Sequence, residues 1–220
     1  MGRKLSEEEI KERLSPIDDE DVKYFYRPKC SYYFFIPPDK NNGNSLGTGK
    51  SRPRSGTNRN GFHVSYYPEY YERFRLHSDP WIQQAIVQYK KQGVLFPINA
   101  KRQEGKLVLD EKNNPIPEPV KVKIKICATS KKLKNKSVAK INLSADADNV
   151  CGAFMDLPSF ANGSSNGGLA SIEDRVLCDD NLKNIIKSST EYIEEATKSQ
   201  APLGYGVYIT VEVLEQVSIE

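Results

Sequence analysis

Residues 120–128 alternate between apolar and polar side chains, which is the pattern of a β-strand with one buried face. In a strand, the apolar set faces the core and the lysine set forms a row of ammonium groups on the other side. The apolar set is Val120, Val122, Ile124 and Ile126, and the lysine set is Lys121, Lys123 and Lys125. This segment therefore predicts a sheet with one buried face.

Other segments predict helices and further strands. The clearest helix spans residues 79–92, with Asp79 as its cap, Pro80 in the first helical position and Gly93 after its end. Its expected apolar face consists of Trp81, Ile82, Ala85, Ile86 and Tyr89. A second helix is expected from Asp148 to Leu157, where apolar residues recur at i, i+3, i+4 and i+7. Strands are expected at residues 31–36, 62–67, 106–110 and 207–214, and residues 181–197 fit either a helix or a strand.

These elements predict an α+β fold in which helices pack against a single mixed β-sheet. At 220 residues, one domain with an appendage is expected. Residues 6–14 form a charged helical pattern that is too polar to build a core. We therefore divide the chain into an N-terminal helix and linker, residues 1–22, and a main domain, residues 23–220. Within the main domain, residues 39–60 are basic and nearly free of apolar side chains, which predicts a mobile loop.

The composition favours a cytoplasmic protein. No apolar run approaches the roughly 20 residues that span a bilayer, and the N-terminus lacks the apolar core of a signal peptide. The net charge of +3 is too small to indicate a nucleic-acid partner by itself. The cysteines have no CxxC spacing, so we expect no zinc site and reduced, mostly buried thiols. These cysteines are Cys30, Cys127, Cys151 and Cys178.

Two acidic patches follow a long basic segment. Residues 120–145 contain eight lysines and no acid. Asp146 and Asp148 then open the second predicted helix, Asp156 lies near its end, and Asp179–Asp180 closes an apolar run. Carboxylates that converge repel one another unless a hard cation such as Mg²⁺ lies between them. Asp148 also fits a helix N-cap and Asp179–Asp180 a strand-to-turn boundary, so both interpretations stay open.

A cation site beside a field of lysines predicts a polyanionic substrate, and nucleic acid fits that description. The residues expected to contact phosphates are Lys50, Arg52, Arg54, Lys121, Lys123, Lys125, Lys131, Lys132, Lys134 and Lys136. The alternative is that these residues belong to an exposed loop and a solvated turn. Residues 43–51 miss the spacing of a phosphate-binding P-loop by one position and Pro53 follows them, so no nucleotide cofactor is expected.

The order of these residues resembles the RusA family of Holliday junction resolvases, phage-type endonucleases that cut four-way DNA junctions. The family pattern is a basic segment, then Asp-x-Asp-Asn opening a helix that carries a further Asp, then a hydrophobic stretch ending in Asp-Asp. This chain has Lys131–Lys140, Asp146-Ala-Asp148-Asn149, Asp156 and Val176-Leu-Cys-Asp179-Asp180 in that order. The resemblance covers roughly residues 31–215, by pattern and not by close identity.

The resemblance implies a RusA-like fold and a homodimer that hydrolyses phosphodiester bonds with Mg²⁺, or with Mn²⁺ in its place. It implies that Asp146, Asp148 and Asp180 hold the cation, with Asp156 or Asp179 assisting. The expected partner is branched DNA during recombination and repair, in the cytoplasm of a bacterium or of a phage-infected host. No membrane partner is expected.

Two features depart from the family pattern. Gly152 stands four residues after Asp148, where the family carries a functional lysine, and the spacer between Asp156 and Asp179 is longer than usual. We hypothesise that Lys140 or Lys183 supplies the missing ammonium group. Two alternatives to junction cleavage stay open: a phage replication or recombination accessory protein that binds DNA without cutting it, and a metal-dependent nuclease that acts on flaps or single strands.

Overall fold

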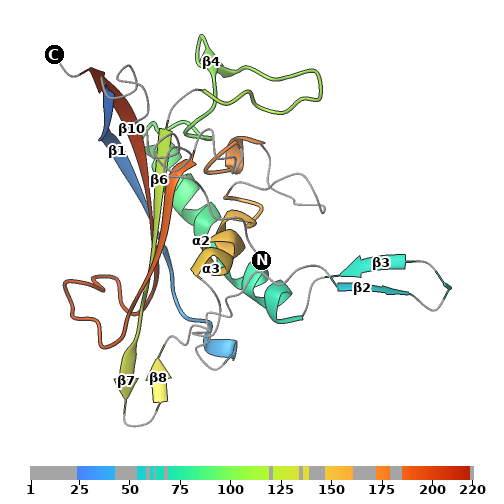
Figure 1. The fold of residues 1–220 in the computed structure, drawn as a ribbon, viewed down its shortest axis with the longest axis vertical. Helices are drawn as coiled ribbons and strands as arrows, with labels where there is room; N and C mark the ends of the chain where they lie inside the picture. Colours follow the sequence, from blue (N-terminus) through green and yellow to red (C-terminus); the bar gives the residue numbers. More distant parts are fainter. Residues whose placement is uncertain are drawn as a thin grey trace, which may run out of the picture.

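The computed structural model is built around a four-stranded β-sheet (Figure 1). It describes residues 24–42, 54–57, 60–61, 63–66, 69–118, 121–133, 136–138, 147–160, 172–178 and 185–218. The strand order is β1, β10, β6, β9, with antiparallel pairing except between β6 and β9, which are parallel. The bounds are Tyr24–Ile36 for β1, Lys121–Thr129 for β6, Ile185–Ile193 for β9 and Gly206–Ser218 for β10. The predicted α+β class with a mixed sheet is confirmed.

Two helices lie on one face of this sheet (Figure 1). Helix α2, Glu69–Lys91, packs against β1, and helix α3, Ala147–Met155, packs against β9. Phe74 of α2 and Phe154 of α3 meet edge to face with ring centroids 5.0 Å apart. Beneath them, Val122, Ile124 and Ile126 of β6 are fully buried in the same core. The apolar half of the alternating strand therefore faces the helices, as its period of two predicts.

Three small hairpins extend from this body (Figure 1). Strand β7 follows β6 after the single residue Ser130, so the β7–β8 hairpin grows out of the end of the main sheet. The bounds are Arg54–Thr57 for β2, His63–Tyr66 for β3, Arg102–Gln103 for β4, Lys106–Leu107 for β5, Lys131–Leu133 for β7 and Lys136–Val138 for β8. Two short 3₁₀ turns complete the description, η2 at Lys40–Asn42 and η3 at Ile172–Asp174.

Helix α2 begins ten residues before its predicted start, so the assignment of Asp79 as its cap is wrong. Pro80 lies inside the helix and offers no N–H to the carbonyl of Leu76. Both residues are exposed, so water can satisfy that carbonyl. Trp81 was expected on the apolar face but is 39% exposed. Gly93 follows the helix end as predicted, with a left-handed φ of 84° that suits glycine.

Most other predicted elements are confirmed with different lengths. Strand β1 extends the predicted strand toward the N-terminus, and β10 extends its predicted strand at both ends. The ambiguous residues 181–197 contain strand β9, and residues 39–60, predicted as a loop, contain η2 and β2. The strand predicted at 106–110 shortens to the two residues of β5. The predicted N-terminal helix lies outside the described residues.

The cysteines differ from the prediction of mostly buried thiols. None of these four described cysteines forms a disulfide bond, and Cys151 alone among them is buried. Cys127 and Cys178 are half-buried, and Cys30 is exposed. Cys30 lies beside a register shift in the pairing of β1 with β10, where the strand bulges.

Candidate functional site

The acids of the first acidic segment that the structure describes, Asp148 and Asp156, lie at opposite ends of α3. Asp148 is the second residue of this helix and Asp156 follows its last residue, while Asp146 lies outside the described residues. The N–H of Asp156 still donates to the Gly152 carbonyl over 3.0 Å, so the helical spacing continues to Asp156. At 1.5 Å per residue, the backbones of Asp148 and Asp156 are about 12 Å apart. That separation is too long for both carboxylates to bind one Mg²⁺ ion at about 2.1 Å.

The turn after α3 is hydrogen-bonded to the segment that leads to the second acidic pair. The N–H groups of Val176–Leu177 donate to the carbonyls of Ser159–Phe160 over 2.9 and 2.7 Å. Asp156 precedes this contact by three residues, and Asp179 follows it by two. The C-terminal end of α3 is therefore joined to the chain segment that precedes Asp179–Asp180.

Residues 176–178 are also hydrogen-bonded to Ile98 and Asn99, which precede the β4–β5 hairpin. The Ile98 N–H donates to the Val176 carbonyl over 2.9 Å, and the Cys178 N–H donates to Asn99 Oδ1 over 2.8 Å. Asn99 is fully buried, and its backbone carbonyl accepts the N–H of Glu118 over 2.7 Å. Cys178, the last described residue before the acidic pair, is thus held by a buried amide side chain.

Asn99 and Arg175 are buried polar residues beside this segment that sequence reasoning missed. Asn99 gave no signal, because it lies in a short apolar stretch with no recognisable motif. Arg175 gave one, because it directly precedes the apolar run Val176–Cys178, where a charged side chain is unexpected.

The predicted row of ammonium groups on β6 is in part a row of ion pairs. Lys123 Nζ lies 3.0 Å from Glu212 of β10, its cross-strand neighbour, and Lys125 Nζ lies 2.7 Å from Glu191 of β9. The hydrogen bond between Lys125 and Glu191 lowers the pKa of the carboxyl and raises the pKa of the ammonium group. Phosphates at Lys123 or Lys125 would have to compete with these carboxylates.

The β7–β8 hairpin contains a second group of the predicted basic residues, at the end of the main sheet. Its eight residues, 131–138, carry four lysines and no acid. At its base, the Oγ1 hydroxyl of buried Thr129 donates to the Gly206 carbonyl and accepts the Gly206 N–H, each over 3.1 Å. Ser130, also buried, donates its N–H to the Ile193 carbonyl over 3.0 Å, and its Oγ lies 2.7 Å from the hydroxyl of Tyr192. The hairpin is therefore held at its base by both neighbouring strands.

Several predicted site residues fall outside the described residues: Lys50, Arg52, Lys134, Lys140, Asp146, Asp179, Asp180 and Lys183. Among the residues that the structure describes, no group of three or more His, Cys, Asp or Glu side chains could hold a metal ion. Three of the five predicted acids are not among those residues, so the cation site stays a prediction. Arg54 lies on β2, Lys131 and Lys132 on β7, and Lys136 on β8.

Comparisons with protein-family models, with curated proteins and with solved structures find no match to this chain.

Proposed function

We propose that this protein is a Mg²⁺-dependent, structure-selective endonuclease of the RusA type that resolves four-way DNA junctions by hydrolysing phosphodiester bonds. The observation that carries the proposal is the connection from β6 to β9, which are neighbouring parallel strands. The basic hairpin, helix α3 and the segment before Asp179 all belong to this connection. Elements that the RusA pattern gives in order are thus gathered into one crossover at one edge of the sheet.

Two contacts support a meeting of the acidic patches. Helix α3 packs against β9, the strand that follows Asp179–Asp180, and the turn after α3 is hydrogen-bonded to Val176–Leu177. We expect Asp146, Asp148 and Asp180 to hold the cation, because carboxylate oxygens are the ligands that Mg²⁺ prefers. The bound cation would lower the pKa of a water molecule and neutralise charge that develops on the phosphate.

The length of α3 decides which of the two acids that the resemblance implies, Asp156 or Asp179, can assist at the cation. Asp156 lies about 12 Å from Asp148 along the helix, so we assign it no share in a cation bound by Asp148. Asp156 is already engaged in a polar contact. We therefore favour Asp179 as the assisting acid.

Contacts to the DNA backbone would come from the β7–β8 hairpin more than from β6. The hairpin carries Lys131, Lys132, Lys134 and Lys136 without a neighbouring acid in its sequence, whereas Lys123 and Lys125 are paired with carboxylates. Lysine contacts to phosphates carry no base readout, so binding would be selective for shape and not for sequence. Each phosphate that a lysine neutralises should add about −0.9 to the slope of log K, the binding constant, plotted against log[salt].

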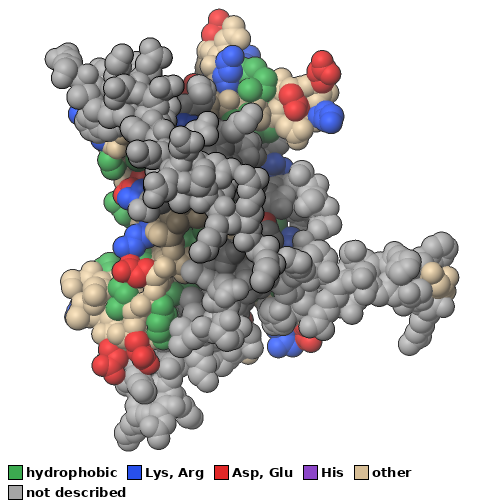
Figure 2. Space-filling view, viewed as in Figure 1, with side chains coloured by type: hydrophobic (Ala, Val, Ile, Leu, Met, Phe, Trp, Pro, Cys, Tyr) green, Lys and Arg blue, Asp and Glu red, His purple; other side chains and the backbone are tan. Residues whose placement is uncertain are grey.

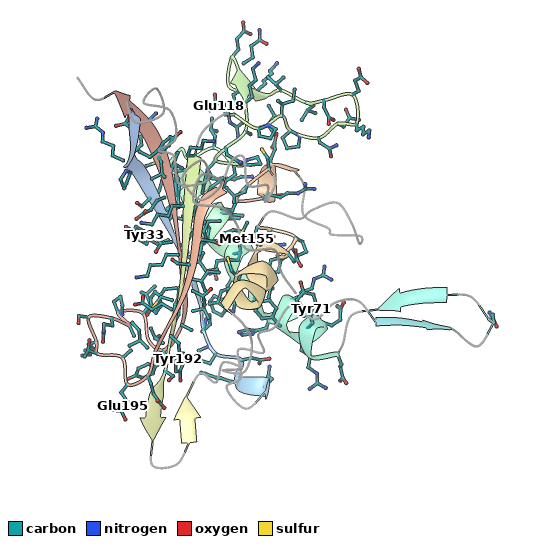
Figure 3. All side chains as sticks on the ribbon, viewed as in Figure 1. Tyr33, Tyr71, Glu118, Met155, Tyr192 and Glu195 are labelled. Carbon is teal, nitrogen blue, oxygen red and sulfur yellow. The ribbon has the colours of Figure 1, made fainter. Side chains whose placement is uncertain are left out.

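The homodimer would use the sheet face that α2 and α3 leave uncovered. Tyr33 is 64% exposed on this face, where the rings of Phe35 and Tyr208 lie 4.8 Å apart. Figure 3 shows Tyr33 on the side of the sheet opposite Met155 of α3. On that side, at the left of Figure 2, apolar, basic and acidic side chains are interspersed. A surface with balanced charge suits contact with an identical copy across a two-fold axis. Two sites related by that axis would match the symmetry of a four-way junction.

The decisive variant is Asp148→Asn, tested on labelled four-way, flap, duplex and single-stranded DNA with Mg²⁺ and with EDTA. We expect the wild type to cut the four-way junction in Mg²⁺ alone, and the variant to lose cutting while it binds the junction as tightly or more tightly in EDTA. The tighter binding follows because a negative charge near phosphates has been removed. Asp110→Asn is the matched control, since Asp110 is exposed and asparagine keeps the oxygen that accepts the Lys112 and Asn114 N–H groups.

The same assay separates the two alternatives. Binding without cutting in any divalent cation would favour the accessory protein. Gly152, which stands at the position of the family lysine, is the feature of this chain that favours that alternative. Preferential cutting of flaps or single strands would keep the chemistry and change the substrate. Lys140→Ala and Lys183→Ala complete the panel, because one of them should cut more slowly if its ammonium group replaces the missing lysine.

None of the described helices combines the length and the apolar character that crossing a lipid bilayer requires.

A further inference from the structure

Strand β1 forms one edge of the main sheet, and it pairs with β10 alone among the strands that the structure describes (Figure 1). Its residues 31–36, Ser-Tyr-Tyr-Phe-Phe-Ile, include no charged side chain, no glycine and no proline. A short uncharged segment of aromatic and β-branched residues tends to pair with identical copies of itself. An edge strand also presents backbone N–H and carbonyl groups to which such a copy can bond. Strand β1 therefore has both the sequence and the position of a self-association site.

The hydroxyl of Tyr89, from helix α2, lies at the middle of this edge. It accepts the Tyr33 N–H over 2.8 Å and donates to the Tyr33 carbonyl over 3.1 Å. These two backbone groups therefore point away from β10, and in an antiparallel pair the same holds for Ser31 and Phe35, two positions to either side. One hydroxyl thus takes the donor place and the acceptor place that a neighbouring strand would need at Tyr33.

Two prolines limit the same edge on either side of the residue that Tyr89 contacts. Pro28 has no N–H to offer, and the pairing register with β10 shifts between Pro28 and Cys30. Pro37 directly follows the end of β1. Prolines and bulges are means by which natural sheets prevent the addition of a further strand. Only the stretch between the prolines is left for pairing, and Tyr33 lies near its middle.

We propose that the Tyr89 hydroxyl closes the outer edge of β1 against pairing with the same strand of a second copy of this chain. The ring of Tyr89 is fixed by aromatic neighbours, with centroids 5.5 Å from Tyr32, 5.9 Å from Phe34 and 6.2 Å from Phe96. The packed ring holds the hydroxyl against the strand, and the hydroxyl is the part that acts on the edge. The contact leaves the open sheet face, the surface proposed for the homodimer, accessible.

Tyr89→Phe tests the proposal in the full chain, because it keeps the ring and removes only the hydroxyl. Hydrogen exchange measured by NMR should show the Tyr33 amide exchanging about fivefold faster, as expected for the loss of one ordinary hydrogen bond. In sedimentation velocity, the variant should form species that are larger than the wild type and that bind thioflavin T. Adding Ser31→Lys should restore the wild-type size, because a charge within the stretch opposes pairing.

Tyr192→Phe is the matched control. It removes a hydroxyl that lies 2.7 Å from Ser130 Oγ, on the strand at the opposite edge of the sheet, and it should keep the wild-type exchange and size. An unchanged Tyr33 amide and an unchanged size in Tyr89→Phe would overturn the proposal. Faster exchange throughout the central strand β6 would reject it as well, since the association would then come from global unfolding. Assemblies that Ser31→Lys does not reverse would place the association on another surface, which also contradicts the proposal.

Discussion

The carboxylate of Asp79 joins the middle of α2 to the turn after α3. Its Oδ1 accepts the Ser159 N–H over 2.9 Å, and its Oδ2 accepts the Ser159 hydroxyl over 3.1 Å. Gln83, one turn along α2, also donates to Oδ2 over 2.9 Å. Ser159 is fully buried, so its N–H and hydroxyl have no access to water if the carboxylate is removed. This single side chain therefore holds the turn that pairs with Val176–Leu177.

We expect Asp79→Ala to lower the free energy of unfolding by about 3 kcal/mol. Each hydrogen bond from Ser159 to the ionised carboxylate contributes about 1.5 kcal/mol, the low end of the range for charged acceptors, because Asp79 is only half-buried. For a chain of this size, 1 kcal/mol shifts the melting temperature by roughly 2–4 °C, so the expected decrease is roughly 6–12 °C.

Urea denaturation measures the effect, followed by circular dichroism and by the fluorescence of Trp81, the chain's single tryptophan. The midpoint should fall without a change in the slope m, since the folded state stays equally compact. Ser159→Ala removes only the hydroxyl bond and should cost about 1 kcal/mol. Gln83→Ala removes an exposed hydrogen bond and should cost no more than about 0.5 kcal/mol. If Asp79→Ala unfolds within about 0.5 kcal/mol of the wild type, the carboxylate does not hold this turn and the reasoning fails.

Two further predictions concern the open sheet face. The Lys125 hydrogen bond lowers the folded-state pKa of Glu191 below its ordinary value of 4.5, so the stabilisation is fully present above pH 4.5 and is lost as the pH falls through the lowered value. Urea midpoints measured between pH 7 and pH 3 should therefore fall less steeply for Glu191→Gln than for the wild type, and parallel curves would exclude this contribution. Tyr33→Glu places a charge in the proposed dimer contact and should shift the sedimentation coefficient from dimer to monomer, whereas a dimer that tolerates it uses another surface.

The elements with strong local signals could be predicted from the sequence, and the contacts between distant segments could not. The alternation in β6 correctly predicted that Val122, Ile124 and Ile126 are buried. It could not show that Lys123 and Lys125 on the other face meet Glu212 and Glu191, because those acids come from strands more than 60 residues later in the chain. Local periodicity reports which face a residue occupies, and it carries no information about the neighbouring strand.

The start of α2 shows how a local rule can point to the wrong boundary. An acid followed by proline fits the first turn of a helix, where a missing N–H costs nothing. Here the helix continues through Pro80, and because Leu76 and Pro80 are both exposed, water can satisfy the carbonyl left without a donor. Asp79 is thereby free to bond Ser159, a contact between residues 80 positions apart that no local pattern contains.

The long spacer between the acidic patches does not measure their separation in space. The chain leaves the turn after α3 at Phe160 and returns at Val176, and the Leu177 N–H bonds the Phe160 carbonyl over 2.7 Å. A loop whose ends are held together can lengthen at a small cost, about 0.6 kcal/mol for each doubling. In the proposed nuclease, the long spacer is therefore compatible with a RusA-like arrangement, and the departure that would bear on catalysis is Gly152. Gly152 lies one helical turn beyond Asp148 in the sequence of α3, at the position where the family carries its lysine. An ammonium group at this point would have to come from another segment, which is why the cleavage rates of Lys140→Ala and Lys183→Ala distinguish a working nuclease from a binding protein with the same fold.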